Sequence, residues 1–596
     1  MTPRLRRLHA ALGRLLDDQR LRVSRAEALP QLAVLGIACG LLAALVMIGF
    51  RMVIELSQAA FLPPGGPENY EALPPGVRFL LPIAGALAVV GILQPLPELA
   101  RSVGVVHVLE RLAYHQGRLP FRNAVVQFVG ADVAIVSGMS VGREGPAIHL
   151  GAASASVAGQ RIGLPNNSLR VLVACGAAAA IAASFNTPLA GVAFAMEVVL
   201  MEYTVIGFAP VILAAVSATA VTHVAYGDAP AFAVPPLTLA SLWELPYVLG
   251  VGLVIGVLAA VFIALVDAIT RRTGAWPFWI RAVLAGALTG AAALPAPQIM
   301  GIGYDTVGSA LLGDVPATVL LAIVAFKLLA TGVTIGMGVP GGLIGPVLVV
   351  GAAAGGALGV FGQWLVPANV SSPGFYALIG LGAMMAGTLH APLAALTAML
   401  ELTGNPHIIW PGMLAAIAAY GMSRVAFGQQ PVFLALMRAR GLDYRDDPIA
   451  QSLPRVGVRA AMDSSVVALP RKASRAEIDA ALARSPAWVL VIGERGPEAL
   501  LPAVDLARQT MNDPEAEEFD LLELPADRMQ VAEVPIEATL QEALDTMDAS
   551  GADALYVNRV ATSSGIEAYG VVTRAQIETQ YRYVYRPDEQ SRSAGA

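Results

Sequence analysis

Residues 142 to 152 read Gly-Arg-Glu-Gly-Pro-Ala-Ile-His-Leu-Gly-Ala, and residues 342 to 352 read Gly-Leu-Ile-Gly-Pro-Val-Leu-Val-Val-Gly-Ala. The two copies share two glycines, the proline and the final Gly-Ala, and Ile344 stands where the first copy has Glu144. A second phrase also recurs: Ser184-Phe-Asn-Thr-Pro-Leu-Ala is followed by Glu197, and Thr388-Leu-His-Ala-Pro-Leu-Ala is followed by Glu401. The sequence therefore predicts two duplicated halves. Apolar halves interrupted by Gly and Pro are typical of a transport site built at the repeat interface.

The composition is that of a multi-pass membrane protein. The 596 residues are 56% hydrophobic and 14% charged, with a mean hydropathy of +0.64. Because irregular backbone at membrane depth must be covered by protein or line water, 59 Gly and 41 Pro predict broken helices around a pathway. We expect an all-α polytopic fold with re-entrant helices. Apolar stretches suited to spanning a bilayer recur from about Leu32 to Val432, for example 32–50, 79–94, 205–222, 245–266, 279–293 and 316–335.

The termini of the chain differ from this membrane region. Seven arginines precede the first span, which predicts a cytoplasmic N-terminus by the positive-inside rule, and no signal peptide is recognised. The charged sequence after Phe433 predicts a soluble C-terminal α/β domain. The expected divisions are a basic arm over 1–28, the membrane domain over 29–437, a linker over 438–455, the α/β domain over 456–584 and a flexible tail over 585–596.

The first copy of the motif carries charge inside an apolar segment. From Phe128 to Gln160 the formal charges are Asp132, Arg143 and Glu144. A charge at membrane depth costs about 2.5 kcal/mol or more, so it faces protein or water and indicates a functional site. The Gly-Pro after Glu144 predicts a helix start, and helix N-termini attract anions through unpaired N–H groups. Gly142 and Gly145 allow the backbone to approach a ligand closely.

The two copies together predict a gated anion site. Two helix starts from opposed halves converge on one anion, and the carboxylate of Glu144 takes the place of the anion when none is bound. The alternative is that both phrases are only tight helix turns and that Glu144 is a paired structural acid. Arg143 either adds positive potential to the path or pairs with Asp132, and Lys327 either raises the field near the path or forms a buried ion pair.

Other chemistry is not indicated by the sequence. Cys39 and Cys175 lie in apolar segments, so neither a disulfide nor a thiolate metal site is expected. The histidines are too scattered for a metal site, and no nucleophile elbow, phosphate loop or His-Glu-x-x-His phrase occurs. The chain is therefore not predicted to be an enzyme. Neither a required cofactor nor a nucleic-acid partner is expected.

Four phrases in consistent order resemble the CLC family of chloride channels and proton-coupled chloride exchangers. They are Gly142-Arg-Glu-Gly-Pro146, Phe185-Asn-Thr-Pro-Leu-Ala-Gly191, Gly341-Gly-Leu-Ile-Gly-Pro346 and His390-Ala-Pro-Leu393, and the resemblance covers roughly residues 30 to 440. It implies a homodimer in the cell membrane with one pore per subunit, inverted-topology halves and Glu144 as the gating glutamate. It also implies that the backbone N–H groups of Leu343 and Ile344 bind the anion.

Three positions depart from the family pattern. In Ser102-Val-Gly104-Val-Val106 the anion-contacting serine becomes Val103, unless the register slips by one and places Ser102 there at the loss of the Gly104 match. The second hydroxyl donor, a tyrosine, becomes Phe433. The site would then keep its backbone donors and lose its side-chain hydroxyls, which leaves the anion preference open.

The third departure concerns protons. The intracellular-side glutamate of the exchangers becomes Val198, which argues for passive conduction rather than tight coupling. Glu197 either carries the proton in place of that glutamate or shares a structural role with Glu401.

The tail contains a repeat of its own. Ser474-Arg-Ala-Glu-Ile-Asp-Ala-Ala-Leu482 and Thr539-Leu-Gln-Glu-Ala-Leu-Asp-Thr-Met547 are capped helix patterns, each followed by a short strand. This resembles a pair of CBS (cystathionine-β-synthase-type) motifs, which implies adenine nucleotide as a candidate ligand. The ribose phrase is incomplete, because Gln576 follows Thr573 and Pro502 precedes Asp505 where the pattern needs Asp and Ser or Thr. A purely structural tail is the alternative.

The leading hypothesis is a channel or weakly coupled transporter for chloride or a similar small anion, gated by Glu144. A proton/chloride antiporter is the alternative within the same class. A membrane-anchored nucleotide-sensing protein with a vestigial pore is the alternative from a different class.

Overall fold

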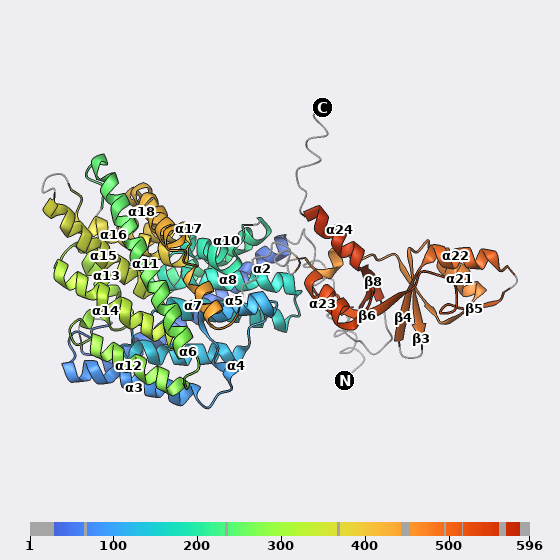
Figure 1. Cartoon of the computed structure of the whole chain (residues 1–596), viewed down its shortest axis with the longest axis horizontal. Coiled ribbons are helices and arrows are strands. Elements are labelled where there is room, and N and C mark those ends of the chain that lie inside the picture. The colour runs from blue at the N-terminus through green and yellow to red at the C-terminus, as the bar shows by residue number, and fades with distance from the viewer. Residues whose placement is uncertain are drawn as a thin grey trace. The chain divides into compact units, whose positions relative to one another are not determined.

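The computed structural model describes residues 29–64, 68–203, 205–232, 237–365, 370–442, 453, 456–493, 496–514, 516–558 and 568–584. The predicted basic arm and flexible tail lie outside these residues. The chain divides into a membrane unit, Leu29–Ile162 with Leu169–Tyr444, and a C-terminal unit whose main part follows Tyr444 (Figure 1). The predicted boundary at residue 437 falls inside helix α19 (Val432–Ala439), so the membrane unit continues past it.

The membrane unit is helical in both halves. Among the described residues, eight helices are long and apolar enough to cross a membrane, and each of the six predicted apolar stretches coincides with a helix. The first half contains α2 (Leu29–Phe61), α3 (Pro75–Leu93), α4 (Glu98–Arg101), α5 (Gly104–Tyr114), α6 (Phe121–Val136), α7 (Glu144–Arg161), α8 (Asn166–Phe185), α9 (Pro188–Phe194), the π-helix η1 (Ala195–Leu200) and α10 (Val205–Tyr226). The second half contains α11 (Leu245–Thr273), α12 (Phe278–Ala292), α13 (Tyr304–Leu312), α14 (Ala317–Gly336), α15 (Ile344–Leu365), α16 (Pro373–Leu389), α17 (Pro392–Thr403) and α18 (Ile409–Gly421).

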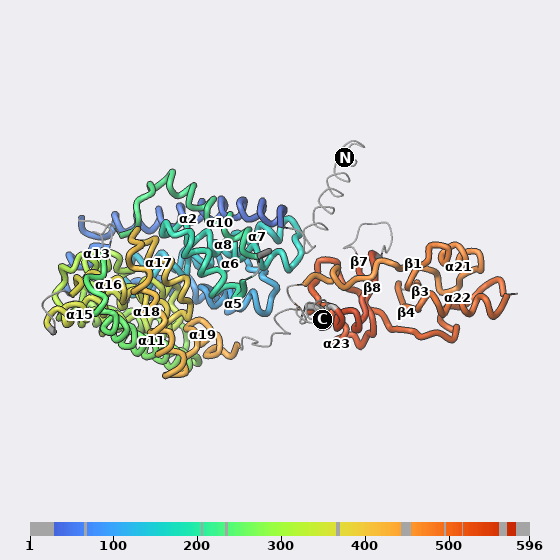
Figure 2. Tube along the Cα trace, turned by 90° about the horizontal axis from the view of Figure 1, so that it is seen from above, coloured from blue at the N-terminus to red at the C-terminus, as the bar shows by residue number. Residues whose placement is uncertain are grey.

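Equivalent helices of the two halves pack in equivalent ways. In the first half α2 runs along α10, where a Cβ atom built on Gly36 would lie 2.5 Å from the carbonyl oxygen of Pro210 (Figure 2). In the second half α11 runs along α18, where a Cβ atom on Gly252 would lie 2.6 Å from the carbonyl oxygen of Ala415. Glycine at these positions lets the backbones approach closely, as small residues do between membrane helices.

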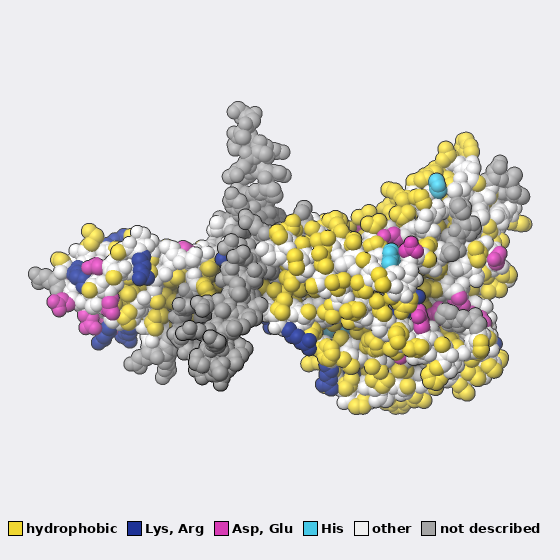
Figure 3. All heavy atoms as spheres, turned by 180° about the vertical axis from the view of Figure 1, so that it is seen from behind, with side chains coloured by type: hydrophobic (Ala, Val, Ile, Leu, Met, Phe, Trp, Pro, Cys, Tyr) yellow, Lys and Arg dark blue, Asp and Glu magenta, His cyan; other side chains and the backbone are white. Residues whose placement is uncertain are grey.

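The surface of the membrane unit is suited to lipid. Hydrophobic side chains cover most of the face seen in Figure 3, and charged side chains are sparse there. Large apolar side chains such as Val34, Leu45, Leu80 and Val261 are about half exposed or more. Such a surface is unfavourable in water and favourable in a bilayer.

The C-terminal unit contains the order β-α-β-β-α twice, around a six-stranded sheet. The strands are ordered β1 (Val466–Pro470), β3 (Trp488–Gly493), β4 (Gly496–Pro502), β6 (Met529–Pro535), β7 (Ala554–Asn558) and β8 (Ala568–Thr573). In each repeat the first strand pairs parallel with the second, which pairs antiparallel with the third. The helices are α21 (Arg475–Leu482), α22 (Ala503–Asn512), α23 (Leu540–Ser550) and α24 (Arg574–Val584), and β2 (Lys472–Ser474) pairs with β5 (Glu518–Asp520).

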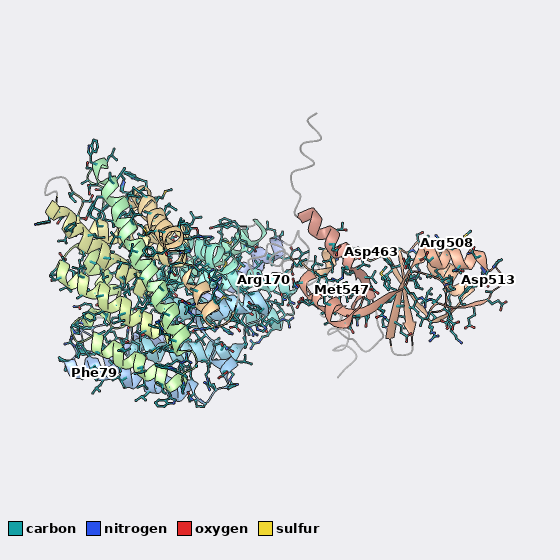
Figure 4. All side chains as sticks on the ribbon, viewed as in Figure 1. Phe79, Arg170, Asp463, Arg508, Asp513 and Met547 are labelled. Atoms are coloured by element: carbon teal, nitrogen blue, oxygen red, sulfur yellow. The ribbon has the colours of Figure 1, made fainter. Side chains whose placement is uncertain are left out.

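The local signals in this unit are confirmed by its hydrogen bonds. Ser474 and Thr539 begin α21 and α23 in capping boxes with Glu477 and Glu542. Figure 4 labels Met547 on α23, where its side chain is buried in the core of the second repeat, and Arg508 on α22. Each repeat therefore has its own apolar core, and the fold agrees with the expected pair of α/β motifs.

Candidate functional site

The two copies of the duplicated motif meet each other inside the membrane unit. The backbone N–H of Gly142 donates to the carbonyl oxygen of Gly342 at 2.6 Å, and the N–H of Gly342 donates to the carbonyl oxygen of Gly142 at 2.7 Å. This is an isolated antiparallel bridge. Because the paired segments are copies of one sequence and run in opposite directions, the halves are inverted relative to each other where they meet.

Glycine is required at this bridge by the space available. A Cβ atom built on Gly342 would lie 2.6 Å from the backbone nitrogen of Gly145 and 3.0 Å from the carbonyl oxygen of Gly142. A Cβ atom on Gly145 would lie 2.9 Å from the Cα atom of Gly342. The recurring glycines of the motif therefore allow the two backbones to touch.

A helix begins at the same place in each copy. Helix α7 begins at Glu144 and α15 begins at Ile344, immediately beyond the bridge. The first N–H groups of a helix have no partner within it. Within the described part of the chain, no protein acceptor is found for the N–H groups of Leu343 and Ile344. These are the donors that the resemblance assigns to the anion, and they remain available.

The carboxylate of Glu144 lies against the start of the opposite helix. A Cβ atom built on Gly345 would lie 2.5 Å from Glu144 Oε1, and one built on Gly342 would lie 3.2 Å from Oε2. The side chain is 3% exposed. Its Oε1 accepts a hydrogen bond from the hydroxyl of Tyr304, and its Oε2 is buried without a partner among the described residues. The acid therefore occupies the electropositive end of α15, which favours an anion.

One cavity is lined by Leu343, the residue immediately before α15. It has about 560 Å³ of empty volume, and we call it the Val103 cavity. Five of the predicted anion-site residues line it, namely Val103, Gly104, Gly145, Leu343 and Phe433. Arg101 and Arg440 also line it and supply positive charge.

The lining of this cavity helps to decide whether Val103 or Ser102 stands at the position of the family's anion-contacting serine. Val103 lines the cavity, and Ser102 is not among its lining residues. This arrangement favours the register that places Val103, and not Ser102, at the anion. The side chains of Val103 and Phe433 bring no hydroxyl to the cavity.

A second cavity contains the gate candidate. It has about 430 Å³ of empty volume, and we call it the Glu144 cavity. Glu144, Ile344, Phe185 and Tyr304 are among the residues that line it. Of the predicted site residues, Glu144 and Ile344 line this cavity and the others do not. The bridge and the start of α15 thus have one cavity beside Leu343 and another beside Ile344.

Arg143 and Lys327 are held by groups other than the acids considered as their alternative partners. No ion pair between Arg143 and Asp132 is found in the described residues; Arg143 donates to the carbonyl oxygen of Ser184 at 3.3 Å, and its guanidinium lies 5.4 Å from the ring centre of Tyr304. Lys327 forms no ion pair there either. It donates to the carbonyl oxygens of Ile299 and Gly301 at 2.9 and 2.8 Å.

Glu197 and Glu401 have a reciprocal structural role. The carboxylate of Glu401 accepts the N–H groups of Leu189 and Ala190 at the start of α9, both at 2.8 Å. The carboxylate of Glu197 accepts the corresponding groups of Leu393 and Ala394 at the start of α17, at 3.1 and 2.8 Å. Each half therefore caps a helix of the other. Val198, beside Glu197 in η1, is buried.

Two of the histidines bond to each other. His107 Nδ1 and His149 Nε2 are joined by a hydrogen bond of 2.9 Å between α5 and α7, and both side chains are buried. No group of three metal-ligating side chains is found in the described residues.

Two residues near the gate, Tyr304 and Glu68, were absent from the sequence prediction. Glu68 accepts hydrogen bonds from the backbone N–H groups of Ile302, Gly303 and Tyr304. The sequence signal that could have identified Tyr304 is the phrase Gly301-Ile-Gly-Tyr304. It lies about 200 positions after Ser102-Val-Gly104 and is the counterpart of that phrase in the second half. Glu68 gave no such signal, because the residues before it, Pro63-Pro-Gly-Gly-Pro67, are typical of an ordinary loop.

Together, the inverted halves, the facing helix starts and the buried acid define a polytopic membrane protein with a candidate ion site at its repeat interface. The family model for the voltage gated chloride channel matches residues 85–424. The chain is 32% identical over 420 residues to a putative chloride channel protein, ClcB-like, of Ralstonia nicotianae, which covers 69% of this chain and 97% of that protein. The chain therefore belongs to the voltage-gated chloride channel, or CLC, family.

Further comparisons agree with this membership. The H(+)/Cl(-) exchange transporter ClcA of Vibrio cholerae is 30% identical, over 53% of this chain and 69% of its own length. Among solved structures, a slow cyanobacterial Cl-/H+ antiporter matches with a TM-score of 0.61 and 23% identity, over 70% of this chain and 99% of its own. A eukaryotic CLC transporter matches with a TM-score of 0.59 and 21% identity, over 92% of this chain and 98% of its own. These structures show the shared fold.

Proposed function

We propose that this protein transports chloride or a similar small anion across a bilayer, as a channel or weakly proton-coupled transporter with Glu144 as the gate. One observation carries the proposal: the starts of α7 and α15 are joined through Gly142 and Gly342, and the carboxylate of Glu144 lies at the start of α15. Unpaired N–H groups at a helix start bind anions without a full cation in lipid. The carboxylate is therefore a built-in competitor for the transported ion.

The region around Val198 supports weak coupling over tight coupling. Val198 is buried and has no group that carries a proton, and the carboxylate of its neighbour Glu197 is engaged with the start of α17. A proton/chloride antiporter is the second candidate, favoured by the relatives and structural neighbours whose names include exchange or antiport. An antiporter of this sequence would need a proton route that avoids position 198.

The deciding experiment measures chloride efflux from proteoliposomes while the external pH is recorded, for the wild type and for Glu144→Ala. We expect chloride efflux from the wild type and faster, pH-independent efflux from Glu144→Ala, because the competing carboxylate is gone. Wild-type vesicles that release no chloride would overturn the proposal. Stoichiometric uphill proton movement would select the antiporter instead.

We also propose a homodimer, placed in the cell membrane with both termini cytoplasmic. Leu189 and Leu393 are 54% and 50% exposed and follow the starts of the short helices α9 and α17. Interrupted backbone next to carboxylates is not tolerated in contact with lipid. A second copy covering this face would protect both starts. The mass of the detergent-solubilised protein after subtraction of bound detergent tests the dimer, and a monomer would refute it.

For the C-terminal unit we propose a CBS-type pair with a structural role, and we retain adenine nucleotide as the ligand to test. At the start of α24 the backbone N–H of Thr573 donates to the side chain of Gln576 at 2.8 Å, and the backbone N–H of Gln576 donates to the hydroxyl of Thr573 at 3.3 Å. The side chains of the incomplete ribose phrase therefore cap this helix. Asp505 pairs with Arg508 at 3.6 Å. We expect ATP and AMP to leave the thermal unfolding of this unit unchanged. A saturable upward shift would instead assign a nucleotide site.

A further inference from the structure

Glu144 has one side-chain partner in the described residues, and it comes from the other half of the chain. The hydroxyl of Tyr304 donates a hydrogen bond to Oε1 of Glu144. Both residues line the Glu144 cavity, and Oε2 of the same carboxylate is buried and receives no hydrogen bond. Oε1 also faces the start of α15, where a Cβ atom built on Gly345 would lie 2.5 Å from it, so Tyr304 and this helix start together set the position of the carboxylate.

The backbone around Tyr304 is held from both directions. On the N–H side, the carboxylate of Glu68 accepts from Ile302 at 3.1 Å, from Gly303 at 3.0 Å and from Tyr304 at 3.2 Å. On the carbonyl side, Lys327 Nζ donates to the residues that precede them, Ile299 and Gly301. A buried acid and a buried amine thus fix the start of α13, so the tyrosine is preorganised before it meets the gate.

The ring of Tyr304 is fixed as well. Phe185 and Phe232 contact it edge to face, with centroid distances of 6.0 and 5.6 Å. The guanidinium of Arg143 lies over the ring at 5.4 Å. With its ring confined in this way, the hydroxyl is directed at the carboxylate of Glu144.

The duplication explains why the hydroxyl stands at this cavity. Gly104 at the start of α5 and Gly303 before α13 both have positive φ, 82° and 88°. Gln127 and Lys327 occupy matching positions, with a side-chain atom 4.0 and 3.3 Å from the Cβ positions of these glycines. In the first half this segment lines the Val103 cavity and brings no hydroxyl, whereas in the second half it lines the Glu144 cavity and brings Tyr304.

We propose that Tyr304 is a positioning residue that latches the gate: its hydroxyl holds the carboxylate of Glu144 at the start of α15. An anion that takes the place of the carboxylate must break this hydrogen bond. The latch rests on the proposed function of Glu144 and adds a second determinant of how often the gate opens. Since Tyr304 acts through Glu144, its contribution disappears when the carboxylate is absent.

The test is chloride efflux from proteoliposomes containing the full chain with Tyr304→Phe, with Glu144→Ala, and with both substitutions. Tyr304→Phe removes only the hydroxyl, and we expect efflux to rise about tenfold, the ratio that corresponds to about 1.4 kcal/mol. In the Glu144→Ala background we expect Tyr304→Phe to change nothing. Tyr247→Phe is the matched control, because it removes a hydroxyl bonded to the backbone carbonyl of Leu358 at 2.6 Å, and it should leave efflux unchanged.

The outcomes separate the latch from the transport proposal. A wild type without efflux overturns the proposed function. If the wild type releases chloride and Tyr304→Phe releases it at the same rate, the latch alone is overturned. The latch is also overturned if Tyr304→Phe changes efflux equally in the wild-type and Glu144→Ala backgrounds, because that result would indicate a structural role. If Tyr304→Phe is not recovered folded, 3-fluorotyrosine in place of Tyr304 keeps the ring and strengthens the hydroxyl donor. Efflux should then fall below the wild-type rate, and an unchanged rate would refute the latch.

Discussion

Substitution of Gly342 by alanine tests whether the contact between the two motif copies maintains the ion site. The added Cβ atom would lie 2.6 Å from the backbone nitrogen of Gly145 and 3.0 Å from the carbonyl oxygen of Gly142. The obstructing atoms are backbone, so they cannot swing aside like the end of a flexible side chain. The bridge must therefore open, which moves Leu343 and the start of α15 away from Glu144.

The size of the effect follows from the clash. Forcing one extra methyl into a close-packed interior typically costs about 1–3 kcal/mol. If that strain falls on the ion-binding conformation, anion transport should slow by about 5- to 150-fold, at 1.4 kcal/mol per factor of ten. The assay is chloride efflux from proteoliposomes, normalised to the amount of folded protein, together with the thermal unfolding midpoint in detergent.

The matched control is Gly250→Ala in α11, where a Cβ atom would meet nothing within 4 Å. This substitution should leave both measurements at the wild-type values. Wild-type efflux and stability for Gly342→Ala would refute the reasoning, because the contact between the two copies would then tolerate a side chain that the geometry excludes.

Three further predictions concern other parts of the molecule. Val103→Ser should change the ranking of halides and nitrate in efflux assays, because it adds a hydroxyl to a cavity that has none at this position, whereas Ser102→Ala should not; an unchanged ranking for Val103→Ser would count against the assigned register. Glu197→Gln and Glu401→Gln should lower the thermal midpoint by similar amounts, since charge-assisted hydrogen bonds contribute roughly 1.5–3 kcal/mol each, and a large inequality would contradict the reciprocal capping. In the C-terminal unit, Arg471 beside Asp520 lowers the pKa of that carboxyl, so the stabilisation is present above the unfolded pKa of about 4 and is lost as the pH falls through the lower folded pKa. Hydrogen exchange over β2 and β5, corrected for the intrinsic effect of pH, should rise in that window, and Asp520→Asn should remove the dependence.

The duplicated phrases made the central geometry predictable. Recurrence of Gly-Pro with an offset of 200 gave two helix starts, and the structure has α7 beginning at Glu144 and α15 at Ile344. The recurrence of Glu197 and Glu401 favoured a shared structural role, which the reciprocal caps confirm. Both inferences succeed because duplication places equivalent residues in equivalent environments.

The parts that sequence missed depend on contacts between distant segments. Tyr304 and Glu144 are 160 positions apart, and Glu68 reaches Gly303 across 235. Charge alone left two roles open for Lys327 and Arg143, a contribution to the field along the path or an ion pair, yet backbone carbonyls satisfy Lys327 and aromatic rings accompany Arg143. Backbone acceptors carry no signature in the sequence, so these partners emerge only from the fold.

The reciprocal caps make the two halves dependent on each other during biogenesis. When the first half has been synthesised, the start of α9 still lacks the acid that Glu401 will bring, and Glu197 has no helix start to neutralise it. Insertion of one half alone would leave an acid and an open helix end facing lipid. We therefore expect either half produced alone to be unstable until the other half supplies its acid and its helix start.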